Sequence, residues 1–347
     1  MWKYVLKRIG LALVTTVIIV SLSFFLIHLL PYQKPLGNYE ARYSYYQKEI
    51  HLGYIYEMAS PETSENAKLI DKVELKMLGT RYIYQTPTST QYFLWIKNIV
   101  TKWDWGVSTY INPGNSASAI IMSKLPTTIK INVWSVIFSV PLGILLGIWA
   151  ALKKNKPTDH IISTSIMVFI SIPSFVLITL LMLLLCYRTG WLPTQWPAAS
   201  SATTATVVKG YILPVICLSF GSICGYARFT RAELCEVMSS EYLLLARTKG
   251  LTKNQAIVRH ALRNAMVPIL PSILAEVIGL LGGSMILEQL YGIPGTGKLY
   301  VTAINSQDYN VLFVDMALYT VIGLVSGVFL DISYGFIDPR IRMGAKK

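Results

Sequence analysis

Residues 9–30 read IGLALVTTVIIVSLSFFLIHLL, an apolar run that follows the basic residues Lys3, Lys7 and Arg8. A helix needs about 20 mainly apolar residues to cross a bilayer core, and this run is long enough. The apolar part of a secretory signal usually covers only about 7–15 residues, and no small-x-small cleavage site follows here. The sequence therefore predicts a retained transmembrane helix.

The remainder of the chain is also strongly apolar. Of its 347 residues, 53% are hydrophobic and only 14% are charged, whereas soluble domains carry about a quarter charged residues. We therefore expect an all-α polytopic membrane protein with six transmembrane helices. Five further segments have the length and composition of membrane spans: Thr127–Leu152, Ile161–Tyr187, Lys209–Ala227, Asn264–Leu287 and Leu312–Ile337.

The distribution of basic residues predicts how these helices are oriented. More than half of the lysines and arginines lie in the N-terminus, the loops after the second and fourth spans, and the C-terminus. Basic residues concentrate on cytoplasmic loops, so both termini are expected in the cytoplasm, as an even number of spans requires. The same rule explains the net charge of +13, and binding of nucleic acid is not expected.

The segment Pro31–Lys124 separates the first span from the others. Long loops cross the membrane largely regardless of their charge, and a loop of this length without structure would be unusual. We therefore expect a helical, tyrosine-rich extracytoplasmic insert over residues 31–124. It separates a first transmembrane helix with a cytoplasmic N-terminus, residues 1–30, from a five-helix core, residues 125–347, that contains a polar loop at 239–263.

This polar and basic loop has clear helix signals. Ser240 is placed to cap a short helix over Glu241–Lys249, and Gly250 stands where a left-handed residue would end it. Thr252 and Gln255 have the spacing of a capping box for a second helix. The loop is therefore predicted to form two short helices that a partner protein recognises.

The same loop carries the strongest motifs of the chain. Ala246–Leu251 reads ARTKGL and Arg259–Ala265 reads RHALRNA. With these motifs the chain resembles the permease subunits of bacterial ABC importers for peptides, of the oligopeptide/dipeptide B type. The resemblance implies a multi-pass protein of the bacterial cytoplasmic membrane. Further motifs of that family follow one another along nearly the whole chain: Gln91–Trp95, Trp105–Ser108, Leu125–Thr128, Gly292–Leu299 and Asp338–Arg342.

The resemblance implies that the loop couples the permease to ATPase subunits. A short helix set in a groove transmits movement because its backbone is stiff. Leu244 and Leu245 depart from the general family pattern, which has glutamate and alanine at these positions. The alternative is a basic loop that lies on anionic lipid headgroups. The residues expected to couple are Glu241, Ala246, Arg247, Thr248, Lys249, Gly250 and Leu251.

The resemblance also implies a complex of several subunits. The expected partners are a second, related permease subunit, two cytoplasmic ATPase subunits, an extracytoplasmic peptide-binding protein and membrane lipid. ATP and magnesium would bind to the ATPase subunits, and no cofactor or metal is expected in this chain. The substrate stays open among oligopeptides, dipeptides, nickel chelates and glutathione.

One motif could suggest a nucleotide site. Gly292–Lys298 fits the GxxxxGK pattern, but Leu299 follows where a phosphate-binding loop has Ser or Thr, and an apolar helix rather than a strand is expected before it. We interpret the segment as a Gly/Pro-rich outer turn. The chain is therefore expected to be a transport subunit without enzymatic activity of its own.

Charged residues inside a membrane are costly and mark functional candidates. Glu276, about half-way along the fifth span, could line the substrate pathway or bond within the helix bundle. Gly283 and Ser284 are candidates for the same pathway, although small residues there would also let helices pack closely. Four other charged residues are expected near helix ends, where water solvates them: Lys130, Glu288, Asp315 and Asp331.

Two other classes of function remain open on the sequence alone. A secondary transporter driven by an ion gradient would need paired intramembrane acids or broken helices in two matching halves, and neither is clear in this chain. A membrane component that senses peptide without moving it is the other alternative.

Overall fold

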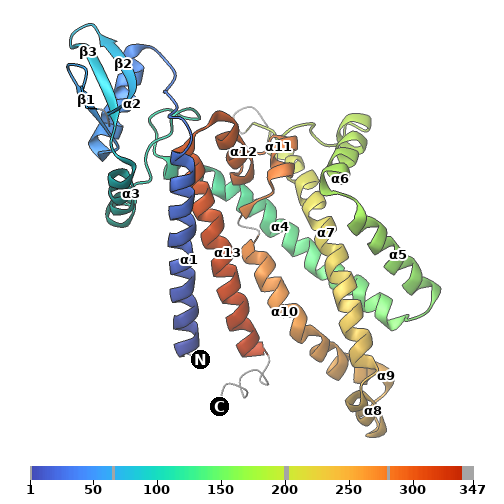
Figure 1. Cartoon of the computed structure of the whole chain (residues 1–347). Coiled ribbons are helices and arrows are strands. Elements are labelled where there is room, and N and C mark those ends of the chain that lie inside the picture. The colour runs from blue at the N-terminus through green and yellow to red at the C-terminus, as the bar shows by residue number, and fades with distance from the viewer. Residues whose placement is uncertain (1, 65–66, 199–202, 280–281, 338–347) are drawn as a thin grey trace. The chain divides into compact units, whose positions relative to one another are not determined.

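The computed structural model describes residues 2–64, 67–198, 203–279 and 282–337 (Figure 1). Among these residues, five helices are long and apolar enough to cross a membrane. The prediction of an all-α polytopic membrane protein is confirmed, while the side on which each terminus lies stays a prediction. The five are α1 (Trp2–His28), α4 (Ala117–Leu152), α7 (Thr204–Met238), a helix over Lys253–Gly279 and α13 (Tyr309–Ile337).

A bent pair of helices stands in place of the third predicted span. α5 (Pro157–Ser171) and α6 (Ser174–Leu181), which continues as the π-helix η1 (Met182–Arg188), meet at an angle of 99° (Figure 1). Pro173 stands between them. A proline lacks a backbone N–H donor and disfavours the helical conformation for the preceding residue, and Ile172 is extended, with φ −77° and ψ 122°. With this pair counted as one span, the described residues contain six.

α4 and α7 extend well beyond the predicted spans. They have 36 and 35 residues and, at about 1.5 Å per residue, each is roughly 50 Å long, whereas the apolar core of a bilayer is about 30 Å thick. The apolar stretch marks only the part that suits the membrane, and the polar ends continue the same helix. Arg228 and Arg231 therefore belong to α7 rather than to a loop.

The chain divides into two compact units. The unit called here the core unit contains Met1–Ile9, Thr127–Ile293 and Ile322–Lys347. The insert unit contains Gly10–Pro126 and Pro294–Val321. Each unit has a hydrophobic core of its own.

In the core unit, α4 packs against α7 at two glycines. Gly143 and Gly147 stand four residues apart and so share one face of α4. A Cβ atom added at Gly143 would lie 2.8 Å from the carbonyl oxygen of Ile223, and one added at Gly147 would lie 2.6 Å from that of Ala227. A larger residue does not fit at either position. This spacing of small residues allows membrane helices to approach closely.

A buried ion pair joins α5 to α7 in the same unit. The Arg231 guanidinium donates from Nε to one oxygen of Asp159 and from Nη2 to the other, the second at 2.7 Å. Asp159 is only 1% exposed, and its carboxylate also accepts the Asn155 N–H at 2.9 Å and the Ser163 hydroxyl at 3.2 Å. A two-pronged contact of this kind is among the strongest that arginine makes. It holds the turn between α4 and α5 against α7.

The insert unit contains a sheet, which corrects the predicted helical insert. Two helices, α2 (Tyr39–Leu52) and α3 (Thr88–Lys102), flank three strands in the sequence. The strands are β1 (Ile55–Met58), β2 (Lys68–Leu75) and β3 (Gly79–Gln85), and they form an antiparallel sheet in the order β1-β3-β2. The prediction of a helical insert is therefore wrong for these residues.

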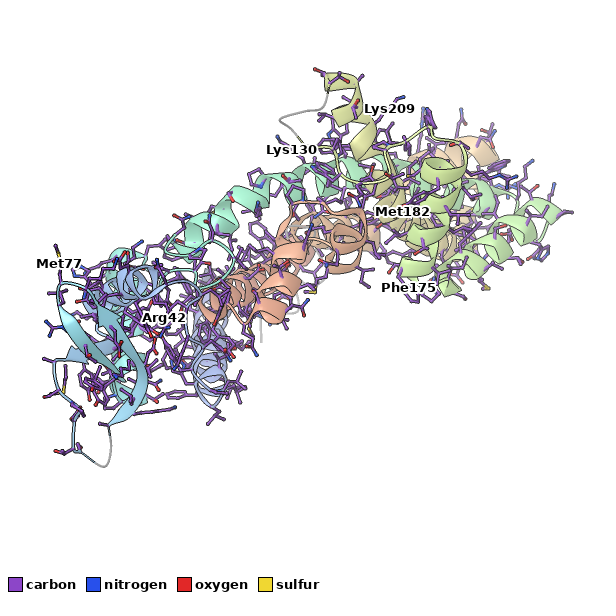
Figure 2. The ribbon with its side chains drawn as sticks, turned by 90° about the horizontal axis from the view of Figure 1, so that it is seen from above. Arg42, Met77, Lys130, Phe175, Met182 and Lys209 are labelled. Carbon is purple, nitrogen blue, oxygen red and sulfur yellow. The ribbon has the colours of Figure 1, made fainter. Side chains whose placement is uncertain are left out.

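Alternating burial explains why these residues form strands. In β2, Val73 and Leu75 are buried while the residues on either side of Val73 are exposed, and in β3 Ile83 is completely buried. Branched and aromatic side chains favour strands. Gly79, with φ +68°, ends the turn between β2 and β3, and Met77 in that turn is 99% exposed (Figure 2).

α2 is fixed to the sheet by the buried carboxylate of Asp71. This residue lies on β2 and is 4% exposed. The Tyr46 hydroxyl of α2 donates to it at 2.9 Å, the Arg42 guanidinium, labelled in Figure 2, pairs with the same oxygen, and Lys34 Nζ lies 3.2 Å from the other oxygen. Three donors thus compensate the charge that the sheet buries.

A second buried carboxylate, Asp308, organises the insert unit between α12 (Thr296–Ser306) and α13. Its Oδ2 accepts the Ser108 hydroxyl at 2.5 Å. The same oxygen accepts the backbone N–H groups of Thr109, Tyr110 and Ile111 at 3.2, 3.0 and 3.0 Å. The segment that follows the motif Trp105–Ser108 is therefore wrapped around one side chain.

The predicted span Asn264–Leu287 is interrupted. α10 (Leu262–Gly279) ends at Gly279, and a separate helix, α11 (Met285–Tyr291), follows. Gly283 has φ +74°, which glycine adopts without strain, and the Ser284 hydroxyl accepts the Leu287 N–H at 3.4 Å as the cap of α11. Gly283 and Ser284 therefore lie between two helices rather than on one helix face.

Candidate functional site

The polar loop after α7 folds into two short helices, α8 (Glu241–Thr248) and α9 (Lys253–Ala256). At the start of α9, Thr252 Oγ1 accepts the Gln255 N–H at 3.4 Å, and Gln255 Oε1 accepts the Thr252 N–H at 3.1 Å. The predicted capping box is confirmed. Figure 1 shows both helices together at the end of α7.

The start of α8 differs from the prediction. Ser240 occupies the N-cap position, but its side chain makes no capping hydrogen bond to α8. Its hydroxyl donates instead to the Val237 carbonyl at 2.5 Å. α7 ends directly before this point, and the last carbonyl groups of a helix lack partners within the helix. The Ser240 hydroxyl, which was expected to cap α8, therefore donates a hydrogen bond to a carbonyl at the end of α7 instead.

Gly250 ends the first helix as predicted. It has φ +96°, and its N–H donates to the Arg247 carbonyl at 3.0 Å. No heavy atom lies within 4 Å of the position that a Cβ atom would take. The backbone conformation, and not a lack of space, therefore requires glycine at this position.

The two faces of α8 have different surroundings. Leu243 is 5% exposed and packs with Leu234, Ala256 and Ile257 in a small hydrophobic core. Its neighbours Leu244 and Leu245 are 61% and 56% exposed. Exposed apolar side chains that form a larger contiguous patch can mark an interaction surface. One side of α8 is therefore anchored in the core unit, and Leu244 and Leu245 are left exposed.

The predicted coupling residues are mostly on the surface. Ala246 and Leu251 are half-buried, and the other five are exposed: Glu241, Arg247, Thr248, Lys249 and Gly250. The sequence interpretation did not single out Leu244 and Leu245 as exposed apolar residues, because it treated them only as departures from a family pattern. Two leucines inside a polar, basic segment were the available signal.

A cavity of about 240 Å³ lies beside α8. Its lining combines the carboxylate of Glu241 with the basic side chains of Arg247 and Lys253. A groove beside exposed apolar residues suits the insertion of a partner's side chain. The remaining lining residues are Met238, Ser239, Ser240, Leu243, Leu244 and Ile257.

The motif RHALRNA begins in a π-helix. η2 (Ile257–Ala261) joins α9 to α10, and π-turns are frequent at functional sites. Ile257 and Ala261 are buried, whereas Arg259 and His260 are exposed. Arg259 and His260 of this motif are therefore accessible directly after α9.

Glu276 on α10 contacts two residues of α7. The Ser222 hydroxyl donates to Glu276 Oε1, and the Tyr226 side chain also forms a hydrogen bond with this carboxylate. The contact within the helix bundle, one of the two alternatives for Glu276, is thus present. The role of Glu276, Gly283 and Ser284 in a substrate pathway stays a prediction.

Two acids that were expected to be solvated near helix ends are buried instead. Glu288 is 3% exposed and Asp315 is completely buried. Glu288 Oε1 accepts the Thr128 hydroxyl at 3.0 Å, and Glu288 lies in the first turn of α11, where the helix dipole favours a negative charge. Lys130, labelled in Figure 2, is exposed and Asp331 is 28% exposed, as expected for them.

The first part of Gly292–Lys298, residues 292–295, forms a turn between two helices, which confirms that part of its interpretation, and the last three residues begin α12. Gly292, with φ +75°, ends α11, and α12 begins at Thr296. A phosphate-binding loop joins a strand to a helix, and here a helix precedes the turn. The lack of a nucleotide site stays a prediction. The motif Asp338–Arg342 lies outside the described residues.

Several membrane helices and a pair of short helices after α7 define the chain as a polytopic membrane protein. Residues 143–343 match the family "Binding-protein-dependent transport system inner membrane component". The chain therefore belongs to this family, and it is a multi-pass protein of the bacterial inner membrane. The matched segment includes α8, η2 and α10.

Full-length relatives support the same family. The chain is 32% identical over 343 residues to the dipeptide transport system permease protein DppB of Lactococcus lactis subsp. cremoris (strain MG1363), covering 99% of this chain and 100% of that protein. It is 32% identical over 346 residues to the oligopeptide transport system permease protein OppB of Haemophilus influenzae, with coverage of 99% and 100%.

A solved structure has a similar fold. A chain of the MetNI methionine ABC transporter in an inward-facing conformation aligns with a TM-score of 0.51 at 16% identity. The alignment covers 64% of the present chain and 97% of that chain. This likeness concerns the fold alone.

Proposed function

We propose that this chain is the permease subunit of an ATP-driven importer for peptides and forms half of the translocation pathway. Two relatives that align over their full length are named as dipeptide and oligopeptide transport permeases. The observation that carries the coupling role is the exposed apolar face of α8 beside the groove. This face would dock on a cytoplasmic ATPase subunit.

The proposal includes the other subunits of the complex. A second, related permease subunit completes the pathway, an extracytoplasmic binding protein delivers peptide, and two ATPase subunits bind ATP and magnesium. Nucleotide can shift the equilibrium between inward- and outward-facing states only through its different affinity for the two states. The contact at α8 is where this difference would reach the permease.

Leu245→Asp is expected to lower ATP-driven peptide uptake at least about tenfold. A leucine that fills a partner's groove can contribute more than 1.4 kcal/mol, which corresponds to about tenfold in affinity. Because Leu245 is 56% exposed in this chain, the variant should accumulate normally in the membrane. The measurement is uptake of a labelled peptide by membrane vesicles with ATP, together with the abundance of the subunit.

Leu243→Asp is the matched control on the same helix. Leu243 is 5% exposed, so an aspartate there would bury a charge without a partner and lower the abundance itself. Normal uptake by Leu245→Asp would contradict docking through this face. If Leu245→Asp still bound the ATPase subunits as the unaltered chain does, measured by copurification, this result would contradict docking as well.

Glu276→Gln is expected to change substrate preference more than abundance if Glu276 lines the pathway. A glutamine can still bond to Ser222 and Tyr226, but it removes the negative charge that would attract a cationic peptide. The measurement compares uptake of cationic and neutral peptides, with the amount of protein in the membrane as control. A variant that only fails to accumulate would favour the packing role.

Transport driven by an ion gradient is the second candidate. Two interrupted helices favour it, the α5–α6 pair bent by 99° and the α10–α11 break, since broken helices often form ion sites in such transporters. Uptake by vesicles that carry an ion gradient but inactive ATPase subunits would support it. Peptide binding without any uptake would support a sensing component.

A further inference from the structure

A cavity of about 100 Å³ lies within the insert unit. Its lining comes from the end of α1, from α2 and α3, and from the start of α13, and it includes the aromatic side chains of Phe24, Tyr45, Tyr54 and Trp95. Leu30, which also lines it, is 48% exposed. At least one lining residue of the cavity therefore lies at the surface, beside the end of α1.

One carboxylate of this cavity is left without a compensating charge. Glu49 on α2 is 5% exposed, and among the described residues no partner lies within hydrogen-bonding distance of its Oε1. None of the lysines and arginines in the described ranges lines the cavity. Gln85 Oε1, also in the lining, is buried and has no hydrogen-bond partner in the described part of the chain either. Two acceptors of this lining therefore receive no hydrogen bond from the described residues, and the indole Nε1 of Trp95, also in the lining, makes none either.

The aromatic lining adds a second kind of attraction for the same type of group. The face of an aromatic ring carries partial negative charge and attracts cations, and cages of several rings recognise ammonium ligands. Phe24 and Trp95 lie with their ring centroids 4.9 Å apart, and Trp95 and Phe313 lie 5.3 Å apart. All three rings line the cavity.

From these contacts we propose that the cavity binds a small primary ammonium group, held by Glu49 and Gln85 and surrounded by the aromatic rings. The volume supports a group of this size, because an engineered cavity of about 150 Å³ holds one benzene molecule. A whole oligopeptide does not fit. The ammonium group can belong to a small free amine or to the amino terminus of a peptide.

Titration of Glu49 should make the affinity of the cavity for an ammonium group depend on pH, which a purely aromatic pocket would not do. Burial and the nearby Asp104 carboxylate raise the pKa of Glu49 to about 8. Below that pH the carboxyl group holds a proton that a bound ammonium must displace, so affinity should rise as the pH increases toward 8 and then level off. Tyr32 and Tyr45 stay neutral over this range, because burial raises their pKa values. The other titratable groups near the cavity are His28 from α1, Tyr54 after α2 and Tyr309 from α13.

Saturation-transfer NMR on the full-length chain in lipid nanodiscs tests the proposal with methylammonium. This probe keeps its proton at pH 9, as a lysine side chain does. Its dissociation constant should fall about tenfold between pH 7 and pH 9. Glu49→Gln should raise the dissociation constant at pH 9 at least tenfold. Glu40→Gln, which changes an exposed acid in the first turn of the same helix, should leave it unchanged.

Two peptides distinguish the source of the ammonium group. Binding of dialanine at pH 7 without binding of N-acetyl-dialanine identifies a peptide amino terminus, and binding of methylammonium alone identifies free amines. No saturable methylammonium signal at pH 9, a pH-independent affinity, or equal affinity in Glu49→Gln would overturn the proposal. The pH series uses the unaltered chain, so it tests whether the cavity binds an ammonium group even where a variant fails to fold. The measurement needs no transport, and its failure would leave the import proposal untouched.

Discussion

Gly250→Pro is expected to abolish ATP-driven peptide uptake while the subunit remains in the membrane. Proline holds φ near −65°, whereas residue 250 has φ +96°. Proline also lacks the N–H group that donates to the Arg247 carbonyl at the end of α8. The chain would leave α8 in another direction, and the exposed leucines would no longer stand beside the groove. Uptake by vesicles and the abundance of the subunit are the two measurements.

Two milder substitutions at the same position separate backbone conformation from side-chain size. An added Cβ atom meets no heavy atom within 4 Å, so Gly250→Ala carries only the backbone strain of about 1–2 kcal/mol. Asparagine tolerates the left-handed region better than other residues, so Gly250→Asn should retain more uptake than Gly250→Ala. Uptake by Gly250→Pro at the level of the unaltered chain would show that this turn does not couple.

Asp308→Ala is expected to destabilise the insert unit by about 3–5 kcal/mol, because it leaves four donors around a buried position without their acceptor. These donors are the Ser108 hydroxyl and the backbone N–H groups of residues 109–111. The midpoint of thermal unfolding of the solubilised protein should fall by roughly 10 °C. Proteolytic cleavage near residues 108–111 should become faster.

Asp104→Ala is the matched control for this experiment. The Asp104 side chain accepts one backbone N–H, that of Gly106, at 2.9 Å. Removal of this side chain should therefore lower the free energy of unfolding by about 0.5–1.5 kcal/mol, the contribution of one hydrogen bond. Equal unfolding temperatures for Asp308→Ala and Asp104→Ala would contradict the organising role of Asp308.

The parts of the fold that depend on local chemistry were predictable from the sequence. Gly250 and the pair Thr252 and Gln255 signal a helix end and a helix start through their own backbone preferences and side-chain hydrogen bonds. The apolar runs likewise located the membrane helices. Their true ends were not predictable, because a helix such as α7 continues after its apolar part.

Features that depend on contacts distant in the sequence were missed. Glu288 accepts a hydrogen bond from the Thr128 hydroxyl, which lies 160 residues away in the sequence. No local sequence pattern indicates that these two residues are in contact. The strands β2 and β3 were missed for another reason. Their alternating residues did carry the signal, but the expectation of a helical insert followed from the length of the loop.

The candidate site was predictable in place but not in detail. The motifs located the two short helices, and the exposed residues that were predicted to couple lie on α8 or directly after it. The leucines that distinguish the two faces of α8 were not identified, because their exposure depends on how Leu243 packs against α7 and α9. A one-dimensional pattern cannot tell which of three consecutive leucines points inward.

The glycine contact between α4 and α7 limits where this molecule can bend. At Gly143 and Gly147 the two backbones lie too close together for a side chain to fit between them. If α4 slid along α7, no side chain at these positions could change its rotamer to accommodate the movement. We therefore expect the two helices to move together as one rigid unit. The Asp159–Arg231 pair attaches α5 to this unit. α8 follows α7 directly, so the proposed docking of a subunit on α8 would act on this pair of helices. Bending of the core unit is then expected where helices are interrupted, at Pro173 and Gly283.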